Sequence, residues 1–231
     1  MSAPASLTVA GVERPLTALA CPLAADALIA PRAGGGGPWH VELGFGKGRY
    51  LLRQAQMQPE ARFLGLEMVG KYARLLARRA ARRGVSNLAV IHGEALYLSA
   101  TTLPRAFADT LHIYFPDPWP KSKHHRRRLF DPTSIDLVLG VLRPGGRLFF
   151  ATDFLAYGED VADLLAGTPG IAVLRRLDQP WPGGARTNYE AKYMTQGRPI
   201  LRLIAELSDP QPAHRLHPAA GLRLLAGSAP A

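Results

Sequence analysis

Short apolar runs alternate with longer amphipathic stretches over most of this sequence. Runs rich in β-branched and aromatic side chains are typical of buried strands. They predict strands at residues 39–44, 62–67, 87–92, 109–115, 147–152, 171–177 and 199–207. Helical spacing of apolar residues is found at residues 49–57, 71–83, 131–142 and 155–166. Because strands and helices alternate, the pattern predicts an α/β fold with a doubly wound, mostly parallel sheet of seven strands.

The two ends of the chain lack this alternation. Residues 1–38 are rich in Ala, Pro and Gly and end in four glycines, which predicts an irregular N-terminal leader. Within the leader, the Ala-rich residues 16–30 are the candidate for a helix. Residues 208–231 contain four prolines and are expected to form a flexible C-terminal tail. The expected domain therefore spans residues 39–207.

Composition restricts the class of protein. The chain has 231 residues, of which 47% are hydrophobic, as expected for one globular domain. Its net charge of +10 favours a polyanionic partner such as nucleic acid, although a basic lid over an anionic metabolite would also use it. With Cys21 as the single cysteine, there is no disulfide framework and no cysteine metal site. No secretory signal or membrane-spanning run is found, so we expect a cytoplasmic protein without bound metal or membrane.

One loop combines several kinds of chemistry. Residues 111–128 read LHIYFPDPWPKSKHHRRR, in which a buried strand ends at a loop with three prolines in five residues. Proline fixes its own φ and keeps the preceding residue out of the helical region, so this loop is stiff and can aim Asp117. Trp119 adds an aromatic plane. An acid, an aromatic plane and cationic groups together are suited to handling a nucleobase in RNA.

A basic run follows this loop directly. Its members are Lys121, Lys123, His124, His125, Arg126, Arg127 and Arg128. Such charge density suits phosphate rather than a protein core, so the run predicts contact with RNA. The alternatives are a solvated face for the run and a simple turn residue for Asp117. We favour function, because neither alternative requires a tryptophan or a neighbouring buried strand.

A glycine turn follows the first predicted strand. Gly44, Gly46 and Gly48 lie between this strand and a helix, an arrangement that lets backbone approach a ligand closely. The spacing is G-x-G-x-G, and Arg49 stands where a dinucleotide fingerprint would have its third glycine. The turn therefore favours a nucleoside without phosphates over a pyrophosphate. A tight connection without ligand is the alternative.

Acidic residues mark the ends of three successive strands. Glu42 lies two residues before the first glycine, where a buried acid is costly unless it binds something such as an ammonium group. Glu67 ends the second strand, where doubly wound folds hold ribose hydroxyls, or alternatively it opens the next helix. Glu94 follows the third strand. Because such strand ends share one edge of the sheet, we expect these acids to line one ligand site.

A second polar loop spans residues 180–190 and reads PWPGGARTNYE. Its prolines, glycines and polar residues predict a segment outside the core. A functional loop is the favoured interpretation, with a mere surface connection as the alternative.

With these residues in place, the sequence resembles the bacterial tRNA (guanine-N7-)-methyltransferase family over residues 41–207. Three ordered motifs carry the resemblance: VELGFGKG at the glycine turn, FPDPWPKSKHHRRR at the central loop, and TNYE at residues 187–190. The resemblance implies a class I, Rossmann-like methyltransferase that transfers a methyl group from S-adenosylmethionine to guanine N7 in tRNA, in the variable loop. Monomeric or oligomeric assembly is left open, with a monomer favoured.

The resemblance also implies roles for individual residues. Around S-adenosylmethionine it places Glu42, Gly44, Gly46, Glu67, Glu94 and Asp117. Asp117 would also be the catalytic acid. Contacts to the target nucleotide are implied for Lys121, Asp153, Thr187, Asn188, Tyr189 and Glu190. Two positions depart from the family pattern: Glu94 stands where a shorter Asp or Asn is common, and Arg126 replaces a usual lysine.

Three other functions compete with this one. A methyltransferase for exocyclic amines would use a D-P-P-[YF] loop, which Asp117-Pro118-Trp119 matches only in part. A nicotinamide-dependent oxidoreductase is disfavoured by the missing third glycine. A non-catalytic RNA-binding protein on the same fold is disfavoured by the intact set of acids.

Overall fold

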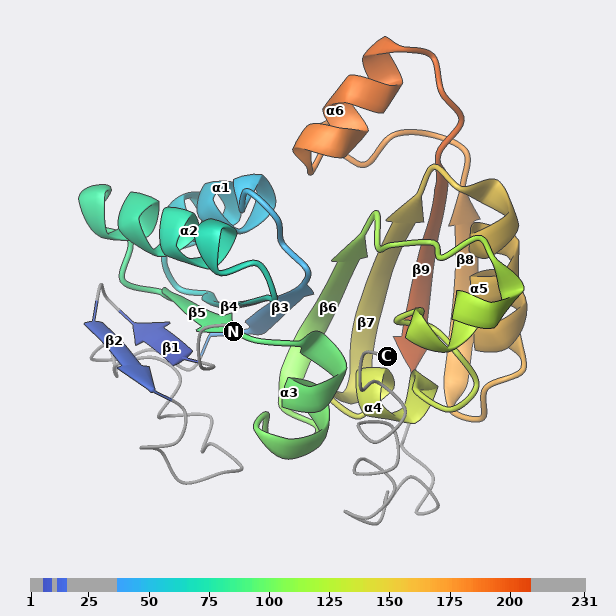
Figure 1. Cartoon of the computed structure of the whole chain (residues 1–231), viewed down its shortest axis with the longest axis horizontal. Helices are drawn as coiled ribbons and strands as arrows, with labels where there is room; N and C mark the ends of the chain where they lie inside the picture. Colours follow the sequence, from blue (N-terminus) through green and yellow to red (C-terminus); the bar gives the residue numbers. More distant parts are fainter. Residues whose placement is uncertain (1–5, 10–11, 16–36, 209–231) are drawn as a thin grey trace.

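A computed structural model describes residues 6–9, 12–15 and 37–208 of the chain (Figure 1). In these residues a single sheet has the strand order β2-β1-β5-β4-β3-β6-β7-β9-β8. Its strands are β1 (Ser6–Val9), β2 (Val12–Pro15), β3 (Trp39–Leu43), β4 (Arg62–Glu67), β5 (Leu88–His92), β6 (Ala108–Tyr114), β7 (Leu142–Thr152), β8 (Ile171–Leu177) and β9 (Leu201–Leu207). Strands β5, β4, β3, β6 and β7 are parallel neighbours, whereas β9 is antiparallel to both β7 and β8. This confirms the predicted doubly wound sheet for its seven predicted strands, whose pairings are mostly parallel, and β1 and β2 extend it beyond the prediction.

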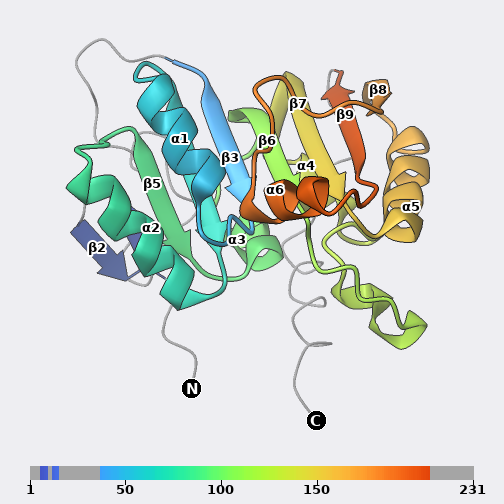
Figure 2. The ribbon, with the colours of Figure 1, turned by 90° about the horizontal axis from the view of Figure 1, so that it is seen from above.

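Helices cover both faces of this sheet (Figure 2). They are α1 (Arg49–Met57), α2 (Gly70–Arg82), α3 (Ala95–Thr101), α4 (Ile135–Leu139), α5 (Leu155–Ala166) and α6 (Asn188–Thr195), with the 3-10 helix η3 (Ser122–Arg127). Alternation along β4 separates two cores. Phe63 packs with apolar residues of α1 and α2, whereas Leu64 and Leu66 join the cluster that includes α3, α4 and α5.

The order of connections creates a topological switch point at the carboxyl ends of β3 and β6, where doubly wound sheets have their ligand-binding crevice. From β3 the chain moves through β4 to β5 on one side and then returns to β6 on the other side of β3. The loops that leave β3 and β6 therefore part in opposite directions, as at the ligand-binding switch point of doubly wound sheets. Helix α6 lies beyond the carboxyl ends of β6 and β7 (Figure 1).

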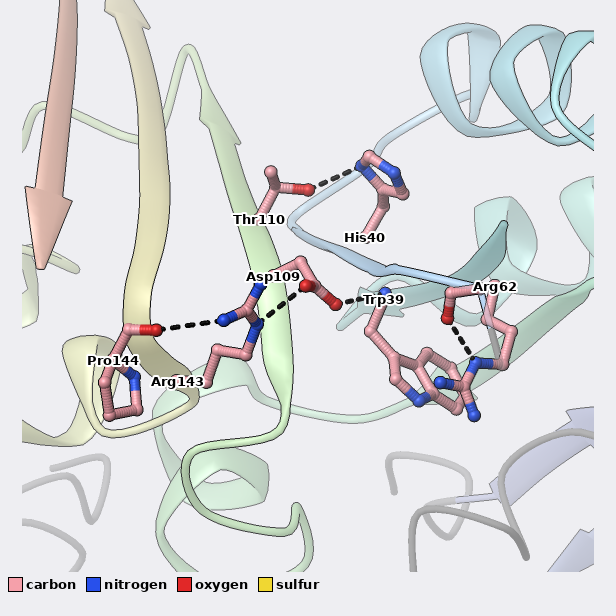
Figure 3. A network of polar contacts seen from close by, with 8 residues as sticks. Trp39, His40, Arg62, Asp109, Thr110, Arg143 and Pro144 are labelled. Atoms are coloured by element: carbon pink, nitrogen blue, oxygen red, sulfur yellow. Dashed lines mark hydrogen bonds and ion pairs between the residues drawn. The ribbon is translucent and has the colours of Figure 1, made fainter. Parts of the chain in front are cut away.

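A polar network fixes the opposite, amino ends of these strands (Figure 3). Asp109 at the start of β6 accepts hydrogen bonds from the backbone N of Trp39, at 2.7 Å, and from Nε of Arg143, at 2.7 Å. Arg62 donates to the carbonyl of Gly37 at 2.9 Å and places its guanidinium 4.8 Å from the ring centre of Trp39. These contacts join β3, β4, β6 and β7 below the crevice.

Two predicted segments differ from the structure. The composition of the leader predicts an irregular segment, but β1 and β2 form a hairpin whose first strand pairs antiparallel with β5. Composition does not indicate this regular structure, which forms because β1 pairs with the otherwise exposed edge of β5. The helix predicted for residues 16–30 and residues 209–231 of the predicted tail lie outside the described residues.

The second difference concerns the Pro144-Gly145-Gly146 cluster. The predicted helix at residues 131–142 and the predicted strand at residues 147–152 lie on either side of this cluster, but α4 ends at Leu139 and β7 already begins at Leu142. Ala108 on β6 pairs with Leu142 while Thr110 pairs with Arg147, so the cluster forms an irregularity within the ladder. A bulge tolerates proline and glycine where a regular strand would not.

The Asp109 network gives a prediction on stability. Asp109→Ala leaves the Trp39 N–H without its acceptor and should lower the free energy of unfolding by about 1–3 kcal/mol. Urea denaturation measures this loss. Asp163→Ala, which removes an exposed carboxylate on α5, is the matched control and should change the free energy much less. Equal midpoints for the two variants would contradict the role given to Asp109.

Candidate active site

The glycine turn forms one wall of the crevice. Gly44 and Gly46 have φ values of 71° and 55°, in the left-handed region that favours glycine. A Cβ at either position would meet no atom within 4 Å, so backbone conformation rather than crowding requires glycine. The N–H of Gly44 donates to Leu66 at 2.8 Å, which ties the start of the turn to β4.

Glu42 is buried at the end of β3. Only 2% of the residue is exposed, and its Oε2 has no hydrogen-bond partner among the described residues. Burial, and then the nearby Glu67, raise the pKa of Glu42 to about 8, while Arg186 acts in the opposite direction. A buried carboxyl with an unpartnered oxygen fits the ammonium group of a ligand, which would favour the ionised form.

Glu67 is bound to the glycine turn. Its Oε2 accepts from the N–H of Gly46 at 2.7 Å, and its Oε1 accepts from the N–H of Val69 at 2.8 Å. Each carboxylate oxygen can accept further hydrogen bonds. The side chain is therefore fixed in orientation and still able to accept from the hydroxyls of a sugar.

Glu94 stabilises the start of α3. It is the N-cap of α3, and its two oxygens accept from the N–H groups of Leu96, at 3.0 Å, and Tyr97, at 2.6 Å. These bonds satisfy donors that a helix start leaves free. The expected contact of Glu94 with a cofactor stays a prediction.

Asp117 is exposed on a strained loop at the carboxyl end of β6. Phe115 and Trp119 on either side of it have φ values of 54° and 39°, which are unfavourable for residues with side chains. Strain of this kind persists only when surrounding contacts fix it, and it is enriched at functional sites. One such contact is the hydrogen bond from Nε of Arg128 to the carbonyl of Pro118, at 2.8 Å.

Arg128 corrects the prediction that the whole basic run contacts RNA. Its side chain is buried, pairs with Asp160 at 2.8 Å and lies 4.7 Å from the ring centre of Tyr157. It therefore supports the Asp117 loop from inside. By contrast, Lys121, Lys123 and Arg127 are exposed.

The histidines of the run are less open than these cations. His124 and His125 are half-buried, and His124 lies edge-on to the ring of Trp119 at 5.7 Å. Arg127 stands over the same indole, 5.1 Å from its centre. Trp119 thus organises the exposed part of the run.

In the predicted target-binding segment at residues 187–190, too, some side chains are exposed and others are buried. Thr187 caps α6 by accepting from the N–H of Glu190 at 3.0 Å. Asn188 and Tyr189 are exposed, and the ring of Tyr189 lies 6.4 Å from that of Phe115. Glu190, however, is 0% exposed and pairs with Arg202 at 2.9 Å, so it fixes the segment from inside, and its contact with the target nucleotide stays a prediction.

Asp153 forms an ion pair in the same region. Its carboxylate lies 2.6 Å from the guanidinium of Arg198, which stands 4.3 Å from the ring centre of Tyr193 on α6. Asp153 therefore connects the end of β7 to the segment after α6. Its predicted contact with the target nucleotide would have to form beside this ion pair.

The sequence interpretation missed the interior of the 180–190 loop. Trp181 is 2% exposed and Arg186 contacts several aromatic rings, so this loop is not a mere surface connection. The Trp, Pro and Gly content of the loop does not indicate this, because the face of β6 and β7 that the loop covers, with Tyr114 and Phe149, exists only in the folded sheet. The loop also forms one wall of a cavity of about 360 Å³ that α1 closes on the other side.

The strand order with antiparallel β9, together with acids at a glycine-turn crevice, defines a methyltransferase of the class I fold. A solved 16S rRNA (adenine(1408)-N(1))-methyltransferase from Catenulisporales acidiphilia shares this fold with a TM-score of 0.53 and 20% identity, over 75% of this chain and 87% of that one. The family model Methyltransf_4, described as "Putative methyltransferase", matches residues 36–203.

Relatives specify the family further. A tRNA (guanine-N(7)-)-methyltransferase of Nitrosococcus oceani is 38% identical over 71% of this chain and 69% of its own length. Another, of Alkalilimnicola ehrlichii, is 33% identical over 84% of this chain and 80% of its own length. The chain therefore belongs to the tRNA (guanine-N(7)-)-methyltransferase family.

The described residues also bear on membrane and metal binding. Within residues 6–9, 12–15 and 37–208, no helix is long and apolar enough to cross a membrane. The same residues contain no group of three or more His, Cys, Asp or Glu side chains able to hold a metal ion.

Burial of Glu42 predicts a pH-dependent stability. Its folded pKa of about 8 lies above the ordinary value of 4.5, so the folded state binds the proton more tightly than the unfolded state. The parent should therefore lose stability relative to Glu42→Gln as pH rises from about 5 to about 8.5, by roughly 2–4 kcal/mol. Urea titrations of both proteins across this range measure the difference. A difference that is independent of pH would contradict the burial of an ionisable carboxyl here.

Proposed function

We propose that this chain transfers the methyl group of S-adenosylmethionine to N7 of a guanine in tRNA, expected in the variable loop. One observation carries the proposal: an exposed carboxylate, Asp117, is held on a strained loop beside the crevice that contains Glu42 and Glu67. Membership of the tRNA (guanine-N(7)-)-methyltransferase family supports the same reaction.

The crevice has suitable groups for the methyl donor. When bound, S-adenosylmethionine supplies an electrophilic methyl group on a sulfonium. Glu42 would accept from its ammonium group and Glu67 from its ribose hydroxyls, while Gly44 and Gly46 leave open space beside the backbone. Glu94 would contact the adenine only if it could do so while capping α3.

The chemistry of guanine suits Asp117. N7 carries an in-plane lone pair that is free at neutral pH, so no strong general base is required. Positive charge develops on the purine during the reaction, and a fixed carboxylate beside it stabilises that charge. Asp117 would also accept from the N–H edge of guanine. The stiff loop contributes by holding this carboxylate in place, because correct positioning supplies much of the rate of such a transfer.

The exposed groups around Asp117 are suited to tRNA. Tyr189 and Phe115 provide aromatic surface beyond the carboxyl end of β6, and aromatic side chains stack on unpaired bases. Lys121, Lys123 and Arg127 provide positive charge toward phosphates. A cytoplasmic location would follow from this substrate.

Two other functions remain to be distinguished from this one by experiment. Transfer to an exocyclic amine would give a different methylated nucleoside, and a non-catalytic RNA-binding protein would give none. The test is incubation with labelled S-adenosylmethionine and unmodified tRNA, followed by mass spectrometry of nucleosides. We expect 7-methylguanosine, and another methylated nucleoside or none would contradict the proposal.

Asp117→Asn tests the carboxylate itself. Asn keeps nearly the same shape but lacks the charge, so single-turnover methyl transfer at saturating donor and tRNA should fall by about 10²–10³. Affinity for tRNA should change little, because phosphate contacts elsewhere dominate it. Asp163→Asn, an exposed change on α5, should keep the parental rate. If Asp117→Asn also keeps that rate, Asp117 is only a turn residue.

The exposed residues of the basic run give a second test, which concerns contact with tRNA phosphates. Replacing Lys123 and Arg127 with Ala should weaken tRNA binding and reduce the log–log salt slope by about one for each phosphate that the protein no longer neutralises. Arg175→Ala removes an exposed charge of the same sign on β8 and should leave the slope unchanged.

Arg128→Ala should behave differently from its neighbours. Without the hydrogen bonds from Arg128 to Asp160 and Pro118, the free energy of unfolding should fall by about 1–3 kcal/mol. Urea denaturation and salt-dependent tRNA titration together separate these effects. If the variant that lacks Lys123 and Arg127 keeps the parental salt slope, these residues do not contact phosphate and form only a solvated face.

A further inference from the structure

Arg186 is a partly buried cation that the predicted site did not include. Its guanidinium carbon lies 4.2 Å from the ring centre of Trp181, 4.7 Å from Phe149, 5.4 Å from Tyr50 and 5.6 Å from Tyr114. It also donates a hydrogen bond to the Tyr114 hydroxyl. Among the described residues, no carboxylate forms an ion pair with it. Aromatic faces and one hydroxyl therefore hold this charge.

This environment selects arginine in particular. A planar guanidinium can lie against several rings and donate in a fixed direction, whereas an ammonium group is more strongly hydrated and loses more on burial. Because no carboxylate pairs with this positive charge, its electrostatic field is not cancelled locally. It can therefore act on other ionisable groups in the same interior.

Arg186 joins the two halves of the proposed site. Its side chain reaches Tyr114, the last residue of β6, three positions before Asp117. Its backbone N–H donates at 2.8 Å to Glu190, whose other oxygen pairs with Arg202 on β9. The residue that follows it, Thr187, caps α6. Arg186 thus connects the segment carrying Tyr189 to the strand that leads to Asp117.

The charge of Arg186 also lowers the pKa of Glu42, against the effect of burial. The titratable groups around Glu42 come from each packed element: Tyr50 on α1, Glu67 on β4, His112 and Tyr114 on β6, and Arg186 on the loop. Burial lowers the pKa of His112 and raises the pKa of both tyrosines, so these three are neutral at pH 7. Arg186 is therefore the positive charge in this set.

We propose that Arg186 is a positioning residue for methyl transfer, which aligns the 187–190 segment with the Asp117 loop through its hydrogen bonds to Glu190 and Tyr114. The inference rests on the function proposed above and adds to it a residue that touches neither Asp117 nor the expected substrate surface. It predicts two separable effects, one on rate and one on the charge of Glu42.

The rate effect is measured with two substitutions. Arg186→Met fills similar volume without charge or donors, and Arg186→Lys keeps the charge but not the planar contacts. We expect single-turnover transfer at saturating donor and tRNA to fall at least tenfold in Arg186→Met, with tRNA affinity changed less than threefold. Arg53→Met is the matched control, because Arg53 lines the same cavity from α1, and it should keep the parental rate.

The charge effect is measured without any substrate. A double-mutant cycle combines Arg186→Met with Glu42→Gln, and urea midpoints are compared at pH 9, where Glu42 is ionised, and pH 5, where it is protonated. We expect coupling at pH 9 and none at pH 5. Arg186→Lys in place of Met should keep most of the interaction with Glu42 at pH 9, because lysine retains the charge although it does not reproduce the ring contacts. This variant also provides a folded protein if Arg186→Met does not fold.

The outcomes separate this inference from the proposed function. Parental rates in Arg186→Met, or coupling with Glu42 that is equal at both pH values, would overturn the role of Arg186 even if Asp117→Asn is slow. A parent that forms no 7-methylguanosine would overturn the proposed function, whereas the stability cycle would still report whether Arg186 acts on Glu42.

Discussion

The pairing of β3 with β6 is the constraint on which the site depends. These strands are neighbours in the sheet but belong to halves of the chain that are connected in opposite directions. Their carboxyl ends therefore leave a crevice with the glycine turn on one side and the Asp117 loop on the other. At their amino ends, Asp109 connects Trp39 to Arg143, so polar contacts fix the register from which the crevice opens.

Buried charge is distributed unevenly around this crevice. Glu190 and Arg202 satisfy each other in the interior, as expected where both partners of an ion pair are fully desolvated. Glu42 has no such partner among the described residues, and because burial of an isolated charge is costly its pKa is raised to about 8. Buried ionisable groups with such a shifted pKa are found mainly at binding and catalytic sites. This difference distinguishes the structural acid on α6 from the acid of the crevice.

The basic run shows the same division on a smaller scale. Consecutive residues of η3 and its end point in different directions, so Arg127 lies over the exposed face of Trp119 while Arg128 turns inward to Asp160. One arginine is available to phosphate and the next supports the strained backbone around Asp117. Stiffness of this loop thus comes from its prolines and from an internal ion pair together.

The sequence alone determined the strand and helix alternation, the glycine turn with its acids, and the loop that carries Asp117. These features follow from local rules: the period of apolar residues, the φ that glycine permits and the rigidity of proline. Only the tertiary structure decided which polar side chains face inward. Arg128 meets Asp160 32 positions away, and Arg186 meets Tyr114 72 positions away. Spacing along the chain does not encode such partners, because burial of a polar side chain depends on what distant segments place beside it.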